Sequence, residues 1–470
     1  MSNKHCLDSN LVRDIGSRLE LMVDDYLIER LTGTRLQLQT PQKVPRAKSP
    51  LLGAYTTVIK DGDIFRATFR TNNPSFHGKH YDGDPGVMTC YAESADGHEW
   101  TFPELGLVEV AGSRANNVIL NETPVCHTFS AFLDTRPGIP SDERFKALAG
   151  LHDEAVAVTR KTDPTAIAPG IKGGLYAYAS PDAIHWRKIS PEPVIPSSAA
   201  GEFGFDSQNV SFWSEPEQCY VCYFREWFMS DGASFAWTPA LKRSIGRVTS
   251  ADFRNWSPTQ SMRPNEPDEH LYTNQTHPYF RAPHIYIATP TRFMANRGES
   301  TDIMFMTARG SAPYSRLFKE AFLRPGPDPA RWGNRANYVA LNVVPTSPTE
   351  MSIYHDHSGD RYVLRTDGFA AVNAPLAGGE MATRPLRFTG TELVINYSTS
   401  AAGRVRVEIQ DVDGTPIPGF AMDDCPDIIG DSIEHVVAWK PGADLGRLAG
   451  QPVRLRFVMQ DADLFALRFR

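Results

Sequence analysis

One short pattern recurs along the chain and constrains its fold more than any single motif does. It consists of the end of a strand, a Ser, one further residue, an Asp, and a Trp four residues after the Asp. A fourth, degenerate copy has Thr307, Arg309 and Tyr314 in place of the Ser, Asp and Trp. The copies are Tyr91–Trp100, Tyr178–Trp186, Val248–Trp256 and Met306–Tyr314. Recurrence of one small structural unit along a chain indicates a repeat architecture, and these strand-rich copies favour a β-propeller.

Each copy has a simple physical interpretation as a tight turn that follows a strand. The Ser and Asp side chains satisfy backbone N–H groups of the turn, and the Trp covers it, so the motif is interpreted as structural rather than catalytic. The copies lie roughly 60 to 90 residues apart, which is more than a compact propeller repeat needs. Large loops are therefore expected between the blades, where binding sites are commonly built.

Five hairpins of apolar, aromatic-rich strands predict five blades. They are Tyr55–Arg70, Cys126–Leu151, Val210–Arg225, Pro278–Arg292 and Met351–Arg365. The segment Leu19–Glu29 is a further strand without a hairpin partner nearby. Closed propellers remove their exposed edges by pairing a terminal strand with the last blade, and we predict this role for the segment.

The sequence pattern changes after Asn373. Apolar and polar residues alternate in four segments separated by turns, as in an antiparallel β-sandwich: Arg387–Tyr397, Gly403–Asp411, His435–Trp439 and Val453–Met459. The stretch Ala374–Thr383 is rich in Ala, Gly and Pro and is interpreted as a linker. We therefore expect an all-β protein without a long helix, with a five-bladed β-propeller and its closing strand in residues 1–373 and a smaller antiparallel β-sandwich in residues 384–470.

Composition excludes several classes of partner. The 470 residues carry a formal net charge of −7 and no long Lys/Arg run, which argues against nucleic-acid binding. The first residues are polar and no apolar run reaches the length of a membrane span, so a cytoplasmic protein that binds no membrane is expected unless a leader was removed. The 6 Cys are scattered and are interpreted as free thiols. No metal and no cofactor are expected, and a homo-oligomer remains open.

Propeller geometry predicts where a site should lie. The innermost strand of a blade starts at one face of the disc and the second strand returns to it, so residues just ahead of the first strand and just after the second meet around the axis. Positions ahead of first strands include Asn116, Asn117, Asp206, Gln208, Asn209, Glu269, His270, Tyr272, Asn274 and Glu350. Positions after second strands include Arg70, His152, Arg225, Glu226, Arg292, Arg365 and Asp367. The rule predicts one funnel lined by acids, arginines and amides.

Carboxylates held across a pocket suit cleavage of a glycosidic bond, because one must donate a proton while another stays ionised. The candidates for these catalytic roles are Asp206, Glu350 and Glu269. The candidate substrate-binding residues are Arg70, Asn117, His152, Asn209, Arg225, Tyr272, Arg292 and Arg365. Each has a structural alternative: an Asp ahead of a strand often forms a turn, Glu269 lies in an acidic loop, and the arginines are equally suited to ion pairs.

Four stretches resemble a known group of proteins: Leu21–Glu29, Phe205–Arg225, Asp302–Phe318 and Asp411–Asp461. They are similar to bacterial five-bladed propeller proteins that are glycosidase-like, akin to glycoside hydrolase families 32, 43 and 130. The resemblance implies a pocket at one end of the propeller axis, with acidic residues from the early blades. Asp206 stands where the third-blade acid is expected, whereas the lead-in to the first blade, Pro45–Gly53, contains no carboxylate.

The sequence thus predicts a glycoside hydrolase that cleaves a glycosidic bond in an oligosaccharide or glycoside, with Asp206 and Glu350 as the main carboxylate pair and Glu269 as a third acid. Two alternatives stay open. The missing first-blade acid is consistent with a non-catalytic carbohydrate-binding propeller. The arginines around the funnel are consistent with an enzyme that acts on an anionic sugar or by phosphorolysis. A carbohydrate is the expected partner in all three cases.

Overall fold

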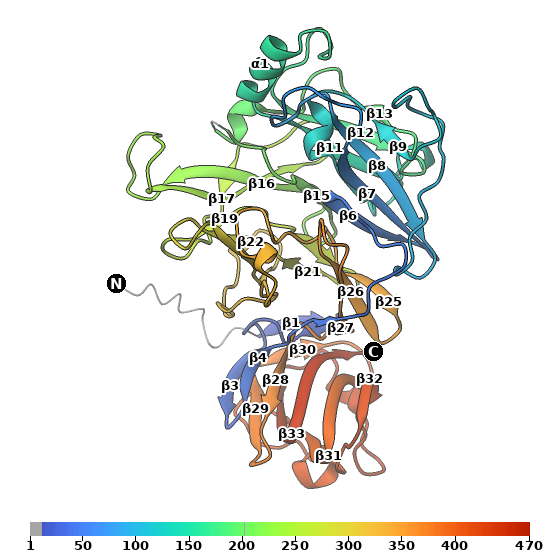
Figure 1. The fold of residues 1–470 in the computed structure, drawn as a ribbon. Coiled ribbons are helices and arrows are strands. Elements are labelled where there is room, and N and C mark those ends of the chain that lie inside the picture. The colour runs from blue at the N-terminus through green and yellow to red at the C-terminus, as the bar shows by residue number, and fades with distance from the viewer. Residues whose placement is uncertain (1–11, 202) are drawn as a thin grey trace. The chain divides into compact units, whose positions relative to one another are not determined.

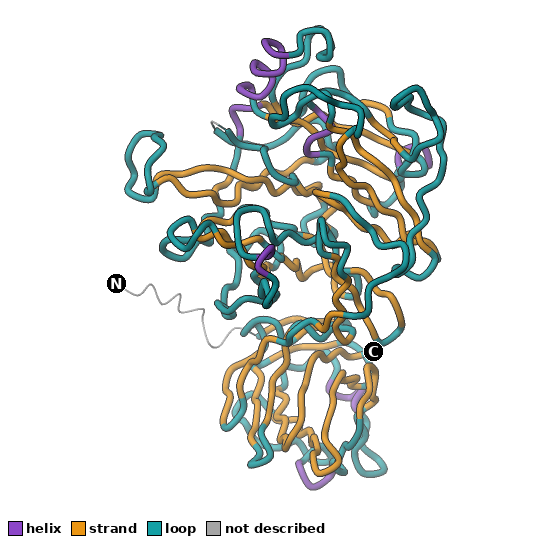
Figure 2. Tube along the Cα trace, viewed as in Figure 1, coloured by secondary structure: helices purple, strands orange, loops and turns teal. Residues whose placement is uncertain are grey.

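The computed structural model describes residues 12–201 and 203–470. They divide into two compact units, a larger one of residues Pro41–Val363 and a smaller one that combines the segment up to Thr40 with Leu364–Arg470. Strands dominate both units, and the predicted all-β class is confirmed (Figure 1 and Figure 2). One helix of ten residues, α1 (Asp153–Thr162), was not expected. No helix among the described residues has the length and apolarity needed to cross a bilayer.

Five sheets of the larger unit follow one another along the chain. The first contains β6 (Ala54–Asp61), β7 (Ile64–Asn72), β8 (Val87–Ser94) and β9 (Val118–Leu120). The second contains β10 (Ser130–Leu133), β11 (Phe145–Leu151), β12 (Gly174–Ser180) and β13 (Arg187–Lys188), and β14 (Ile195–Pro196) also pairs with β12. The third contains β15 (Val210–Ser214), β16 (Cys219–Met229), β17 (Leu241–Ser250) and β18 (Gln260–Ser261).

The fourth and fifth sheets depart from this simple plan. The fourth contains β20 (His277–Tyr279), β21 (Ala282–Ala288) and β24 (Met306–Ala308). A separate small sheet contains β19 (His270–Leu271), β22 (Thr291–Met294) and β23 (Ser300–Ile303). The fifth contains β25 (Val344–Ser347), β26 (Glu350–Tyr354), β27 (Arg361–Arg365) and, from far upstream, β5 (Gln42–Lys43). Short 3-10 helices occupy Val125–Thr128, Ser141–Glu143, Ser197–Ala199, Pro329–Arg331, Met422–Asp424 and Leu445–Leu448.

The innermost strands form a ring. Strand β6 contacts β10, β10 contacts β15, β15 contacts β20, and β25 returns to β6. Between the fourth and fifth blades, the backbone N–H of Val343, just ahead of β25, donates to Nε2 of His277 in β20 at 3.1 Å, so the larger unit is a five-bladed β-propeller. Aromatic pairs connect neighbouring blades: Phe132 lies against Tyr220 with ring centroids 6.4 Å apart, and Phe212 lies against Tyr286 at 4.9 Å. Large buried rings at these interfaces stabilise the ring of blades, since each blade alone has two apolar faces to cover.

The ring is closed by β5, which pairs with β27 as the outermost strand of the fifth blade. Lys43 of this strand also forms an ion pair with Asp360 at 2.8 Å. The predicted closing strand, Leu19–Glu29, is wrong: β2 (Glu20–Leu21) and β3 (Ile28–Thr32) pair instead with strands of the smaller unit. The principle of closure by an N-terminal strand holds, but a later and much more polar segment performs it.

The smaller unit is the β-sandwich, built from both ends of the described chain. Two long strands organise it, β31 (Leu393–Gln410) and β33 (Arg454–Phe469), and β33 pairs with β29 (Gly379–Thr383) in its first half and with β28 (Ala370–Ala374) in its second. The remaining strands are β2, β3, β4 (Arg35–Leu38) and β32 (Asp431–Val436), and a parallel pair of β1 (Arg13–Gly16) with β30 (Leu386–Phe388). They enclose one hydrophobic core.

The domain boundary therefore differs from the predicted 1–373 and 384–470. Met22, Leu27 and Ile28 are buried in the core of the smaller unit, where they cover more apolar surface than an outer blade strand offers. The stretch Ala374–Thr383, predicted as a linker, contains strand β29 in the centre of this sheet. Its Ala and Gly residues suit a crowded sheet interior as well as a flexible linker, and composition alone did not distinguish the two.

The recurring turn motif has the expected structure. In the second blade, Ser180 Oγ accepts from the backbone N–H of Asp182 at 3.2 Å, and Asp182 Oδ1 accepts from the N–H groups of Ile184 at 2.9 Å and His185 at 2.8 Å. Trp186 then donates its ring N–H to a backbone carbonyl of the same turn at 2.9 Å. The motif joins the third strand of the blade to its outer edge, and its role is structural.

We predict that Asp182→Ala destabilises the protein without changing any site at the propeller axis. The substitution leaves two backbone N–H groups without their acceptor, which costs about 1 to 2 kcal/mol in the free energy of unfolding. Urea denaturation at neutral pH measures the loss. The exposed Asp63 of the turn between β6 and β7 provides the control variant Asp63→Ala, for which no comparable loss is expected. Equal stability of the two variants would contradict the role given to the motif.

Candidate functional site

A cavity of about 580 Å³ lies where the five blades converge. All five contribute to its lining, which includes Tyr55, Arg70, Asp82, His127, Asp206, Tyr272, Arg335, Tyr338, His355 and His357. A second cavity of about 310 Å³ shares Asp82, Asp206, Tyr272 and Arg335 with the first. It adds His152, Phe203, Arg225, Trp227, Trp237 and Arg243. Because the two cavities share four residues, we treat them as one site with two lobes.

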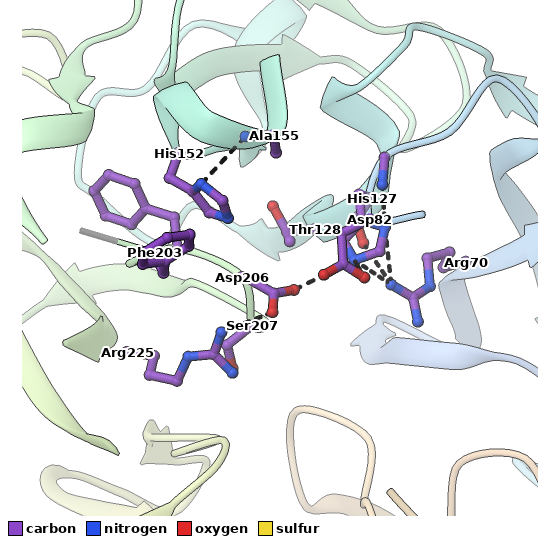
Figure 3. Close-up of polar contacts among 12 residues, drawn as sticks. Arg70, Asp82, His127, Thr128, His152, Ala155, Phe203, Asp206, Ser207 and Arg225 are labelled. Carbon is purple, nitrogen blue, oxygen red and sulfur yellow. Dashed lines mark hydrogen bonds and ion pairs between the residues drawn. The ribbon is translucent and has the colours of Figure 1, made fainter. Parts of the chain in front are cut away.

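Asp206 stands where the two lobes join, just ahead of β15 (Figure 3). Arg225 Nη2 donates to its Oδ2 at 2.8 Å, and His127 Nε2 lies 3.4 Å from its Oδ1. Burial alone would raise the pKa of this carboxyl, but the positive charge of Arg225 and the contact with His127 outweigh it and hold the pKa well below its usual range. The site therefore contains a carboxylate that stays ionised throughout the physiological pH range.

His127 adopts one defined tautomer. Its Nδ1 accepts from the backbone N–H of Gly83 at 3.0 Å, so the ring proton resides on Nε2 and is directed toward Asp206. Burial and the charge of Arg70 both lower the pKa of His127, which keeps the ring neutral. Arg70 Nη1 lies 2.8 Å from Nε2, and with the proton on Nε2 its acceptor is the carbonyl oxygen of His127 at 3.3 Å. His127 thus orients Asp206 as a neutral donor.

Asp82, His127 and Asp206 each offer one ligand atom within 4.8 Å of the other two, a spacing that a metal ion could use. The surroundings do not fit a cation. His127 cannot ligate through Nε2 while Nδ1 accepts a backbone N–H, and the guanidinium groups of Arg70 and Arg225 already contact the cluster. We therefore interpret the three residues as a hydrogen-bonded charge network, and the absence of a metal cofactor stays a prediction.

The wall opposite Asp206 is aromatic and polar. The ring of Tyr338 lies 6.3 Å from that of Tyr55 and 5.6 Å from that of Tyr272. Burial raises the pKa of Tyr55 and of Tyr338 well above the usual value, so both hydroxyls are neutral. The hydroxyl of Tyr338 and Nε2 of His355 are buried without a hydrogen-bond partner in the described chain. Such groups suit the hydroxyls of a ligand, because each can donate or accept one hydrogen bond.

Five of the residues predicted from the sequence line the two lobes: Arg70, His152, Asp206, Arg225 and Tyr272. His152 also caps α1, since its Nδ1 accepts from the backbone N–H of Ala155 at 3.2 Å (Figure 3). The predicted convergence is correct for these positions, whereas their functional roles stay predictions.

The predicted partners of Asp206 lie elsewhere, and the expected carboxylate trio in one cavity is wrong. Glu350 begins β26, which is the second strand of its blade, so it lies at the turn after β25, away from the axial cavity, and contacts Arg361 at 3.1 Å. Glu269 precedes β19 of the separate small sheet and is buried in an ion pair with Arg316. Neither carboxylate lines the two lobes.

Four predicted binding residues are also absent from the lining of both lobes. The side-chain amide of Asn117 donates to the carbonyl of Tyr91 at 2.6 Å, and that of Asn209 donates to the carbonyl of Phe205 at 3.0 Å. Arg292 forms an ion pair with Asp302 at 2.6 Å and lines a separate cavity. Arg365 belongs to the smaller unit, where it bonds to Asn396 at 2.7 Å. These four side chains bond to neighbouring parts of the fold and do not line the site.

Several lining residues were missed. Asp82 lies in the long loop after β7, and Arg335 and Tyr338 lie in the loop ahead of β25. His355 and His357 follow β26 directly, so the rule for second strands would have found them if β25 had been recognised as the first strand. The turn-forming sequence Tyr81–Pro85, soon after the predicted Arg70, was the available signal for Asp82.

No family model matches the chain, and no curated protein matches its sequence. Solved structures do resemble it, among them a glycoside hydrolase at 10% identity, covering 70% of this chain and 91% of the other with a TM-score of 0.43. A family 43 arabinoxylan arabinofuranohydrolase from Bacillus subtilis, in complex with cellotetraose, gives 13% identity, coverage of 89% and 95%, and a TM-score of 0.40. A β-1,2-mannobiose phosphorylase from Listeria innocua gives 11%, 69% and 93%, and 0.42. The chain thus resembles solved structures of glycosidases, as expected from its sequence. The fold described above rests on the order and pairing of the strands themselves.

Asp356, between the two lining histidines, is fully buried and lies behind the cavity wall. Burial raises its pKa to about 7, against smaller opposing effects of the Thr56 hydroxyl and the backbone N–H groups of Thr56 and Tyr55. An unfolded Asp ionises near pH 3.8. Between these values the folded protein holds a proton that the unfolded chain has lost, so this group makes the free energy of unfolding fall as the pH rises toward 7.

We predict that Asp356→Asn removes this pH dependence, because an amide has no proton to lose. Relative to the wild type, the variant should gain about 2 to 3 kcal/mol in the free energy of unfolding between pH 5 and pH 8. Urea denaturation at four pH values in this range measures the difference. Asp63→Asn, at an exposed turn, is the matched control and should follow the wild type. Parallel pH profiles for Asp356→Asn and wild type would contradict the assignment.

Proposed function

We propose that this protein binds a carbohydrate at the propeller axis and hydrolyses a glycosidic bond there. One observation carries the proposal: Asp206, kept ionised by Arg225 and His127, lies with a carboxylate oxygen within 4.8 Å of one from Asp82, in a cavity to which every blade contributes. Paired carboxylates in an axial pocket with neutral aromatic and imidazole walls are what this reaction requires.

The two carboxylates suit different roles. Asp206 has a stabilised negative charge and would face the anomeric carbon as positive charge develops on the sugar ring. Asp82 lies on a loop with 44% of its side chain exposed, where it would meet the departing oxygen. In the proposed reaction Asp82 would act as the general acid that gives a proton to the departing oxygen.

A double displacement is the proposed course. Retaining enzymes hold their carboxyl groups about 5 to 5.5 Å apart, and an oxygen of Asp206 within 4.8 Å of one from Asp82 is compatible with that spacing. In the first step an Asp206 oxygen would bond to the anomeric carbon while the bond to the leaving oxygen breaks and that oxygen takes the proton of Asp82. In the second, water would give a proton to Asp82 and attack the same carbon, which releases Asp206. The configuration of the sugar would be retained.

A specific observation also favours the alternative of a carbohydrate-binding propeller without catalysis. Both oxygens of Asp206 contact neighbours, Arg225 and His127. In the first blade, the residue of β6 that lines the cavity is Tyr55 rather than an acid. A carboxylate stabilised this strongly is a weak nucleophile. In that case sugars would bind in the same cavity, and no product would form.

Turnover of aryl glycosides tests the proposal, with 4-nitrophenyl furanosides and pyranosides as the panel. Asp206→Asn should lower kcat by a factor of at least about 100, because the charge that faces the anomeric carbon is lost. Asp82→Asn should impair glycosides with poor leaving groups far more than nitrophenyl ones, which depart without a proton. Glu350→Gln is the control and should retain activity, since Glu350 contacts Arg361 at a distant turn.

The stereochemistry and the binding data separate the two functions. NMR of the first product should show retained configuration, and inversion would exclude Asp206 as the nucleophile. Sugar binding without turnover across the panel would favour the non-catalytic propeller. Failure of every glycan to bind would overturn both.

A further inference from the structure

The smaller lobe contains two arginines whose hydrogen-bonding capacity the protein leaves incomplete. Only 3% of the surface of Arg225 is exposed. Its Nη2 donates to Asp206, while its Nε and Nη1 are buried without a partner. Nε of Arg243 is likewise buried without a partner. Both side chains line the same cavity of about 310 Å³. Buried donors without acceptors cost about 1 to 3 kcal/mol each, so their persistence calls for an explanation.

Aromatic rings fix the planes of both guanidinium groups. The Arg243 group lies 4.3 Å from the ring centre of Trp227, 4.5 Å from that of Tyr272 and 5.2 Å from that of Phe293. The Arg225 group lies 5.3 Å from the ring centre of Tyr272 and 5.7 Å from that of Trp227. Stacked guanidinium groups are held in place on their faces, which leaves the N–H groups at their edges for an acceptor.

The charge at this end of the lobe is unbalanced. Among the described residues, Asp206 is the one carboxylate in ion-pair contact with either arginine. Asp82 and Glu154 also line the lobe, but 44% of the Asp82 side chain is exposed to solvent and Glu154 is an exposed residue. Burial, followed by repulsion from Arg225, lowers the pKa of Arg243 to about 10. A buried Arg225 and a half-buried Arg243 beside one anion favour the binding of a further negative group.

We propose that the smaller lobe is a subsite for an oxyanion group that accompanies the sugar at Asp206. Its chemistry is that of a carboxylate or a phosphate, whose oxygens can bridge two guanidinium groups in a charge-assisted contact. Asp206 lines both lobes, so one bound ligand can contact the reacting carboxylate and the arginine pair together. The inference rests on the proposed function, because the sugar is placed at Asp206. The negative charge of the ligand is inferred from Arg225 and Arg243.

The oxyanion has two sources. As a carboxylate it would belong to the substrate, a uronic acid residue or another acidic sugar. As inorganic phosphate it would replace water in the second step: a phosphate oxygen would bond to the anomeric carbon while the bond to Asp206 breaks, and the proton of that phosphate would pass to Asp82. Both cases use the same two arginines.

Calorimetric binding at pH 7 and constant ionic strength tests the subsite without requiring turnover. The probes are methyl β-D-glucuronide against methyl β-D-glucoside, methyl α-D-galacturonide against methyl α-D-galactoside, and inorganic phosphate. The wild type should bind the acidic member of at least one pair, or phosphate, roughly tenfold or more tightly than the neutral sugar. Arg243→Met should abolish this preference. Arg243→Lys, which keeps the charge but loses the planar fork, should retain only part of it.

Arg263→Met is the matched control, because Arg263 also stacks on an aromatic ring, 5.0 Å from the centre of Phe228, but is exposed and outside both lobes. It should retain the preference of the wild type. If Arg243→Met binds only the acidic sugars more weakly than the wild type does, the oxyanion is a substrate carboxylate. If it binds only phosphate more weakly, the oxyanion is an inorganic acceptor. Equal binding of acidic and neutral probes by the wild type, or an unchanged preference in Arg243→Met, would overturn the subsite. A protein that prefers the anion yet cleaves nothing would overturn the hydrolase proposal alone.

Discussion

The site exists because five inner strands are kept in a closed ring. That closure depends on two residues of β5, paired with β27 in the last blade and held by the ion pair of Lys43 with Asp360. Without it β27 of the fifth blade would present an unpaired edge, and Tyr55 of the first blade and His355 of the fifth would no longer be held in one cavity. A short polar strand can perform this task because the backbone supplies the hydrogen bonds and its side chains need no core.

Within that ring, the charge of Asp206 is balanced from two sides. Arg225 donates to one of its carboxylate oxygens and neutral His127 lies against the other, while Arg70 donates to the backbone carbonyl of His127. Desolvation would otherwise neutralise a buried carboxyl, and here opposite charge outweighs it. At Asp356 burial outweighs the charge of Arg70 and the hydrogen bonds around it, so the pKa of that carboxyl is raised instead. Two carboxyl groups from different blades thus differ in protonation because their neighbours differ.

The sequence was most informative where local chemistry determines local structure. The Ser-Asp-Trp turns predicted the outer edges of three blades, and the rule for strand order placed Asp206 and Arg225 correctly, because in the third blade the first recognisable hairpin is the innermost one. It failed for Glu350, since β25 is four residues long, contains a Pro and does not look like a strand. The acidic start and basic end of α1 were visible, but its buried face is too short to give a clear period. Pairing over hundreds of residues, as for β3, has no local signal.

The composition of the smaller unit has a consequence for synthesis on the ribosome. Its first strands emerge early, whereas β28, β29 and β33 follow roughly 330 to 430 residues later, a delay of about 17 to 85 s at ordinary elongation rates. During that interval Met22, Leu27 and Ile28 have no native partners and remain available to chaperones or to aggregation. Strand β5 waits equally long for β27. The larger unit can therefore close only once β27 has been made, and the smaller unit only once β33 has been made.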